Sequence, residues 1–92
     1  MIFLDIKEDK KDIGYSIEDP IVFQDVHNSI QGVQLEYQYL EQIFGKKNVF
    51  WKLIKQSLIN ENDRMYDRLE IELKDGEQLS LFFDITDWFG KF

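Results

Sequence analysis

The C-terminal half of the chain decides its fold, and residues 51–92 read WKLIKQSLINENDRMYDRLEIELKDGEQLSLFFDITDWFGKF. Apolar and charged residues alternate strictly from Arg68 to Lys74, and apolar residues recur at every second position from Leu79 to Ile85. This period of two is expected when one face of a strand packs on a core and the other faces water. Between the two runs, Asp75-Gly76 favours a type I′ hairpin turn, which needs positive φ at both central residues.

Residues 51–59 form the preceding predicted strand, although Leu53-Ile54 and Leu58-Ile59 place apolar side chains on both of its faces. Such a pattern is typical of a central strand or of a strand that contains a β-bulge. The three segments together predict an antiparallel meander. After the meander, Trp88 and Phe89 are expected to fold back onto the edge of the core.

A helix is predicted from about Gly32 to Phe44, because apolar residues there recur with the helical period. The expected apolar stripe consists of Val33, Tyr37, Leu40 and Phe44. Gly45 follows, where helices commonly end on a left-handed residue. The predicted fold class is α+β: one central amphipathic helix packed on an antiparallel sheet with a C-terminal three-stranded meander, in a single domain of residues 1–92.

The N-terminal third is less regular. Met1–Ile6 is predicted to be an opening strand, and residues 13–17 form either a second short strand or an extended loop. Pro20 restricts the residue before it to extended conformations, so it ends that segment. The apolar residues from Ile21 to Val26 form either a strand or an irregular segment.

Composition indicates a small folded domain of the cytoplasm. Of the 92 residues, 43% are hydrophobic and 15% aromatic, which is enough apolar surface for one core. The absence of cysteine excludes disulfides and thiolate metal sites, as is usual for cytosolic proteins. No apolar run approaches the length of a membrane span, and Asp5 interrupts the apolar start too early for a signal peptide.

The net charge of −7 argues against nucleic acid and anionic membranes as partners, since both select for lysine and arginine. The charge is uneven: residues 61–87 hold nine acidic and three basic side chains, whereas residues 33–60 hold two acidic and four basic ones. Such asymmetry can steer a basic protein partner onto one side of the molecule. The same acidity is also typical of a surface that only keeps a domain in solution.

Residues suited to catalysis are sparse. His27 is the single histidine and lies in a turn-like segment, so neither a nucleophile–base pair nor an imidazole metal site is predicted. Glu70 and Glu72 share one strand face, as a general acid and base could, but a solvated strand face gives the same pattern. The glycines are isolated at element boundaries and form no phosphate-binding loop. We therefore expect a binding protein rather than an enzyme, without a cofactor or metal.

Phe82 is the clearest candidate for a binding surface. Alternation places it opposite Leu81 and Phe83, on the face of Glu70 and Glu72, and an aromatic side chain ringed by acids resembles an interface hot spot with a polar rim. The alternative is that the N-terminal segment covers it. More generally, the rings expected to lie off the core face are Tyr39, Phe50, Tyr66, Phe82 and Trp88.

The last two thirds of the chain resemble small immunity proteins of bacterial contact-dependent and other polymorphic toxin systems. The motifs behind this resemblance are Glu36-Tyr37, Tyr39-Leu40, Gly45, Trp51, Gln56-Ser57-Leu58, Tyr66-Asp67, Asp75-Gly76, Phe83-Asp84-Ile85 and Phe89-Gly90-Lys91. The resemblance implies a cytoplasmic protein without enzymatic activity that neutralises a cognate toxin, with a nuclease as the expected class. A basic toxin surface would suit an acidic partner.

The expected mechanism is a steric and electrostatic block of the toxin by the acidic face of the meander. The candidate contact residues are Glu70, Glu72, Glu77, Phe82, Asp84 and Asp87. The alternative is a regulatory or adaptor domain, also without catalysis, that binds another basic protein. The residues leave the oligomeric state open, because an exposed edge strand can pair with itself or with a partner.

Overall fold

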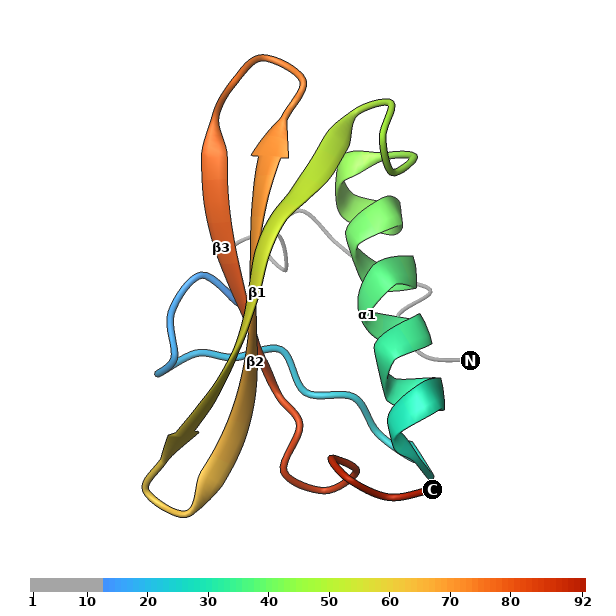
Figure 1. The fold of residues 1–92 in the computed structure, drawn as a ribbon, viewed down its shortest axis with the longest axis vertical. Helices are drawn as coiled ribbons and strands as arrows, with labels where there is room; N and C mark the ends of the chain where they lie inside the picture. The colour runs from blue at the N-terminus through green and yellow to red at the C-terminus, as the bar shows by residue number, and fades with distance from the viewer. Residues whose placement is uncertain (1–12) are drawn as a thin grey trace.

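A computed structural model describes residues 13–92, which form one helix and one three-stranded antiparallel sheet in the order β1-β2-β3 (Figure 1). The elements are α1 (Ser29–Phe44), β1 (Trp51–Glu61), β2 (Arg64–Leu73) and β3 (Gln78–Asp84). The predicted α+β class and C-terminal meander are thus confirmed. The strand predicted for Met1–Ile6 lies outside the described residues.

The two hairpin turns differ from the predicted arrangement. The connection between β1 and β2 consists of Asn62 and Asp63, which both have positive φ, 54° and 62°. At the second hairpin only Gly76 has positive φ, at 94°, so the type I′ turn predicted at Asp75-Gly76 is wrong. The Asp75 carboxylate there accepts a hydrogen bond of 3.0 Å from the Glu77 amide, which favours a longer, side-chain-supported connection.

Strand β1 is an edge strand, so the central-strand interpretation of its apolar pairs is wrong. The alternative holds, because its register with β2 shifts between Leu53 and Lys55, which makes Ile54 the extra residue of a β-bulge. Ile54 is 49% exposed and Leu58 is 54% exposed. Apolar residues on both faces of this strand therefore reflect an exposed edge and not burial on both sides.

Helix α1 starts three residues earlier than expected, at Ser29, because Asn28 supplies the N-cap. Its side-chain oxygen accepts a hydrogen bond of 2.9 Å from the Gln31 amide. At the other end Gly45 has φ of 102°, and its amide donates to the Glu41 carbonyl at 2.9 Å, as predicted for a glycine terminator. Gly32, the predicted first residue of the helix, lies inside it, where a Cβ would stand 2.3 Å from the Trp88 ring.

The buried face of α1 overlaps the predicted stripe only in part. Leu40 is 0% exposed, and Tyr37 and Phe44 are partly buried against the core, but Val33 is 37% exposed. The centre of the buried face lies to one side of the stripe, at Leu35, Glu36 and Tyr39, because a carboxylate is expected in water and an apolar pattern leaves out Glu36. The Tyr39 ring meets the Phe83 ring edge-on, with centroids 6.0 Å apart. One core cluster joins helix and sheet, formed by Ile21, Phe23, Leu35, Tyr39, Leu40, Trp51, Leu69, Ile71, Leu81, Phe83, Ile85 and Trp88.

The N-terminal segment runs along the free edge of β3 before it crosses to the start of α1 (Figure 1). The Gly14 carbonyl accepts a hydrogen bond of 2.7 Å from the Phe82 amide, and Ile21 bonds to Phe82 and Asp84 at 2.9 Å each. Residues 13–17 therefore form a loop, and Ile21 pairs with Phe83 as an isolated parallel bridge.

The aromatic tail follows the prediction at one residue and departs from it at another. Trp88 is 3% exposed and packs into the core, whereas Phe89 is 42% exposed. Tyr39, also expected off the core, is 4% exposed. Of the five rings expected to lie off the core face, Tyr39 and Trp88 are thus buried, because helix and tail bring a second layer of burial that strand alternation does not describe.

Candidate partner-binding face

The sheet has an inner face and an outer face. Its inner face contributes the buried residues Asp67, Leu69, Ile71, Leu81 and Phe83 to the core, and α1 runs along this side (Figure 1). The intervening residues point the other way, because side chains alternate along a strand. We call this second side the outer face; it consists of Lys52, Lys55, Ser57 and Ile59 of β1, Arg64, Tyr66, Arg68, Glu70 and Glu72 of β2, and Gln78, Ser80, Phe82 and Asp84 of β3.

Phe82 lies on the outer face of β3, an outermost strand of the sheet, opposite Arg68 of the central strand β2. It is half-buried, and the Arg68 guanidinium carbon lies 5.6 Å from the centroid of its ring. Arg68 also donates to the Ser80 hydroxyl from Nε at 3.2 Å and from Nη2 at 3.1 Å. A cation held over an aromatic ring in this way presents one flat surface of ring and guanidinium to solvent.

The acidic residues predicted on this face stand beside basic ones. Glu70 is 3.8 Å from Arg68, and Glu72 is 3.6 Å from Lys52. These ion pairs are partly exposed, so each contributes little to the stability of the fold, and the basic side chain of each pair can be replaced by a basic side chain of a partner. The outer face is therefore a mixed-charge surface, and the acid excess expected from the sequence is not concentrated on it.

Asp84 has a structural role at the margin of the same face. Its side chain is 8% exposed and lies 2.7 Å from Nε of Arg64. Thr86 donates to the other carboxylate oxygen, from its hydroxyl at 2.6 Å and from its amide at 3.1 Å. Burial by itself would raise the pKa of Asp84, but the hydrogen bonds from Arg64 and Thr86 outweigh it and hold the pKa below its ordinary value.

Glu77 and Asp87 do not join the cluster around Phe82. Both are exposed, and β3 separates them, since one precedes and the other follows it. A strand of this length spans roughly 20 Å. The structure therefore places Glu70 and Asp84 next to Phe82 on the outer face, sets Glu72 farther along the same face opposite Gln78, and leaves Glu77 and Asp87 at opposite ends of β3.

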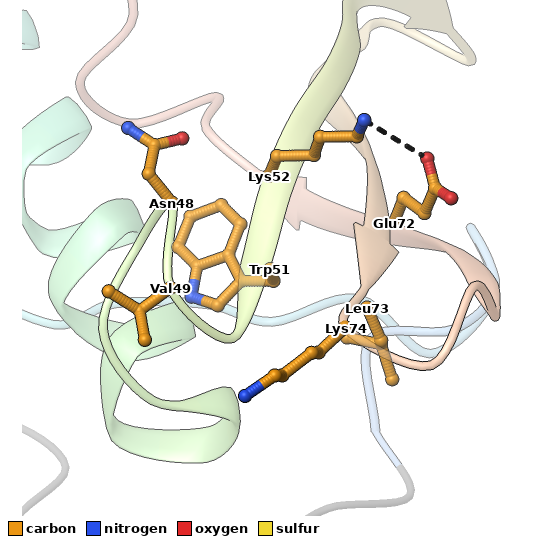
Figure 2. Close-up of a pocket in the computed structure, with 7 residues that line it drawn as sticks. All are labelled: Asn48, Val49, Trp51, Lys52, Glu72, Leu73 and Lys74. Atoms are coloured by element: carbon orange, nitrogen blue, oxygen red, sulfur yellow. Dashed lines mark ion pairs between the residues drawn. The ribbon is translucent and has the colours of Figure 1, made fainter.

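Two hollows border the outer face. One of about 240 Å³ is lined by Ile54, Glu70, Ile71, Gln78, Leu79 and Ser80, and the bulge residue Ile54 forms its apolar side. The other, of about 270 Å³, lies where β1 begins and β2 ends. Figure 2 shows its lining, with the Lys52 ammonium directed at the Glu72 carboxylate and Lys74 on the far side.

Contacts with neighbouring residues fix the position of Trp51, which lines the second hollow. The Trp51 indole N–H donates to the Gly45 carbonyl at 2.7 Å, and its ring stacks on Tyr37 with centroids 6.5 Å apart. Lys74 lies 5.6 Å from the centroid of the Phe50 ring. Sequence reasoning missed this hollow, because its residues come from a loop and two strands far apart in the chain.

A pair of buried carboxyl groups lies on the inner face and was also missed. Glu36 of α1 is 0% exposed and Asp67 of β2 is 2% exposed. Gln56 of β1 donates its side-chain amide to both Asp67 oxygens, at 2.9 and 3.1 Å. Within residues 13–92, neither Glu36 oxygen receives a hydrogen bond.

Burial is the main reason that the pKa of Glu36 rises from 4.5 to about 10, and hydrogen bonding to Asp67 and its charge add to the rise. Two carboxyl groups can share a hydrogen bond only when one of them carries a proton. With a pKa of about 10, Glu36 carries its proton and is neutral at pH 7. Burial, followed by the charges of Glu36 and Asp67, also raises the pKa of Tyr37.

No family model, curated protein or solved structure matches this chain. Within residues 13–92, no helix is both long enough and apolar enough to cross a membrane. Function is therefore inferred from the surfaces of this molecule and from the resemblance noted in its sequence.

Proposed function

We propose that the protein is a cytoplasmic immunity protein that binds a cognate bacterial toxin, with a nuclease as the expected class, and neutralises it without catalysis. The toxin would lie against the outer face of the sheet and be kept from its substrate. The observation behind this proposal is the ring of Phe82 under the Arg68 guanidinium, half-buried on a sheet face that no described helix covers.

The arrangement around Phe82 resembles the unbound surface of a protein–protein interface. Aromatic residues and arginine dominate the energetics of such interfaces, and a polar rim excludes water around them. Here the ring and guanidinium form the centre, and the polar residues next to them on the outer face are Glu70, Ser80 and Asp84. A side chain of the partner could enter the hollow beside Ile54.

Ion pairs on the outer face also suggest how a basic toxin would be recognised. Glu70 and Glu72 contact their bases at 3.8 and 3.6 Å while still partly exposed. A toxin lysine or arginine could replace Arg68 or Lys52 at little cost, because partly exposed pairs contribute only about 0–1 kcal/mol. Overall negative charge would increase the rate of encounter at low salt.

The proposal is tested by co-expression. The product of the reading frame immediately upstream is made in a bacterial host with and without this protein, which bears an affinity tag. We expect toxicity alone and a stable, harmless complex when both are present. An upstream product that is harmless and does not co-purify would contradict the proposal and favour an adaptor for another basic protein.

Variants of this protein then locate the contact. Charge reversal of Glu70 and Glu72 together should weaken the complex and lower the protection. The matched control is Gln34→Ala on the exposed side of α1, which should leave binding unchanged. An affinity for the toxin that the charge reversal does not alter at low salt would exclude the electrostatic part of the mechanism.

A further inference from the structure

The two edges of the sheet are treated differently by the fold. On the side of β3 that faces away from β2, Gly14 and Ile21 form backbone hydrogen bonds with Phe82 and Asp84. On β1, by contrast, the backbone groups of residues 52–61 that point away from β2 form no backbone hydrogen bond with any residue in the described range 13–92. An open edge of this length is a template for pairing with another strand.

The direction of the open backbone groups follows from the pairing across the sheet. The backbone groups of Phe82 and Asp84 form hydrogen bonds with the N-terminal segment, away from β2. Those of Leu81 and Phe83 therefore point toward β2, where the two residues pair with Leu69 and Asp67. Successive residues of a strand point their backbone groups to opposite sides. In β2, the backbone groups of Leu69 and Asp67 point toward β3, so those of the alternate residues Arg68 and Tyr66 point toward β1.

The partners of Arg68 and Tyr66 on β1 are Ser57 and Ile59, which are thus occupied by β2. The outward amide and carbonyl groups are those of Gln56, Leu58 and Asn60. These residues follow the bulge, whose register shift ends at Lys55, so the stretch from Lys55 to Glu61 pairs regularly. Leu58 at its centre is 54% exposed.

We infer that a second copy of this chain pairs with this stretch, β1 against β1 in antiparallel orientation, with Leu58 opposite Leu58. This register places Gln56 opposite Asn60, Ser57 opposite Ile59 and Lys55 opposite Glu61 of the second copy. The Leu58 pair lies on the two-fold axis and occurs once, and every other pair occurs twice. Opposite charges therefore meet at both ends, while two exposed leucines meet at the centre.

Neighbouring registers are less favourable. With the axis at Ser57, Lys55 stands opposite Ile59 and Leu58 opposite Gln56. With the axis at Ile59, Lys55 faces Asp63 in the turn, beyond the end of the strand. Only the Leu58 register combines both charge pairs with outward backbone groups at its centre.

The chosen register provides about six main-chain hydrogen bonds, two for each outward pair. It buries little apolar surface, so a weak and concentration-dependent dimer is expected. Since a two-fold axis perpendicular to the sheet keeps faces on the same side, the dimer would present both outer faces together. The pairing does not depend on the function proposed above.

Sedimentation equilibrium of the full chain tests the inference. The mass should rise from 11.1 kDa toward twice that value as concentration increases. Lys55→Glu and Glu61→Lys should each weaken the dimer by roughly tenfold, and the double variant should restore it, because the charge pairs are re-formed in reverse. Lys46→Glu, an equal charge change at an exposed residue outside β1, is the control.

Leu58→Pro provides a second test, because it removes an outward amide that β2 does not use, and it should abolish the dimer. Circular dichroism confirms that each variant is folded. A chain that stays monomeric to millimolar concentration would overturn the inference. So would a dimer that Lys55→Glu, Glu61→Lys and Leu58→Pro all leave unchanged.

Discussion

The two faces of the sheet handle acidic side chains in opposite ways. On the inner face, Glu36 and Asp67 lie together in the core, and Glu36 receives no hydrogen bond from residues 13–92. On the outer face, Glu70 and Glu72 stand beside basic residues and remain partly exposed. On the inner face, burial of the two acids is tolerated because Glu36 is protonated. On the outer face, Glu70 and Glu72 stay ionised beside Arg68 and Lys52.

This difference separates what the fold requires from what a partner could use. Burial of an acid without a base lowers the stability of the folded state at neutral pH. Exposed ion pairs around an aromatic ring affect folding little and are available for binding. Substitutions on the inner face should therefore change stability, and substitutions on the outer face should change partner affinity.

The largest expected effect compares two neighbours in β3 that point to opposite faces. Phe83 is 0% exposed in the core and Phe82 is half-buried on the outer face. Phe83→Ala should lower the free energy of unfolding by about 3–5 kcal/mol, the usual cost of a large core truncation, and Phe82→Ala by about 1 kcal/mol. Urea denaturation measures both; equal losses would show that the faces are not divided in this way.

The next effect is on pH dependence and concerns Glu36. Its pKa is about 10 in the folded state and 4.5 ordinarily, so its contribution to stability is complete below pH 4.5 and is lost as pH rises toward 10. The wild type should lose about 1.4 kcal/mol per pH unit within this range. Glu36→Gln removes the need for a proton, and should be more stable than the wild type at pH 7 by up to about 3 kcal/mol.

Urea denaturation at pH 5, 7 and 9 measures this difference. The gain from Glu36→Gln should shrink toward pH 5, and the slope with pH should flatten. Glu77→Gln, at an exposed hairpin position, serves as the control and should keep the wild-type slope. A wild type with constant stability from pH 5 to 9 would show that Glu36 is ionised in the fold.

A smaller effect is expected at Asp84, the best-bonded acid of the outer face. Asp84→Asn weakens its contacts with Arg64 and Thr86 and should cost about 1–2 kcal/mol at pH 7. Because the pKa of Asp84 is lowered in the fold, the carboxylate stabilises above its ordinary pKa of 3.8 and this stability is lost as pH falls below it. The difference between variant and wild type should therefore narrow in acid unfolding curves; a difference that persists in acid contradicts this assignment.

The smallest effects on folding are expected from Glu70→Gln and Glu72→Gln. Each acid has one partly exposed basic neighbour, so the melting temperature should change by only about 2–4 °C, equivalent to about 0.5 kcal/mol. A loss of several kilocalories per mole in either variant would mean that these ion pairs belong to the fold.

The strands could be predicted because the alternation of apolar and polar residues is visible within a short stretch of sequence. The alternation in β2 and β3 follows from burial on one side, and it placed Phe82 and Phe83 on opposite faces without a structure. The bulge in β1 was one of two interpretations of its doubled apolar pairs. Pairing decided between them, since only the edge position leaves Ile54 and Leu58 exposed.

Features that depend on long-range contacts were not predictable. The buried side of α1 includes Glu36, which no hydropathy pattern selects, because its burial depends on Asp67 across the core. The charge balance of the outer face arises from pairs such as Lys52 with Glu72, which lie twenty residues apart in the chain. A sum over residues 61–87 counts those acids but not the bases that register brings beside them.

The central claim is that the outer face binds the partner while the inner face holds the fold. Isothermal titration of the upstream product into Phe82→Ala tests it most directly, beside wild type and with melting temperature recorded. Affinity should fall at least about tenfold, as for an aromatic hot-spot contact, while the melting temperature falls by only about 4–8 °C, which corresponds to the loss of about 1 kcal/mol expected for this variant. Wild-type affinity in this variant would contradict the claim.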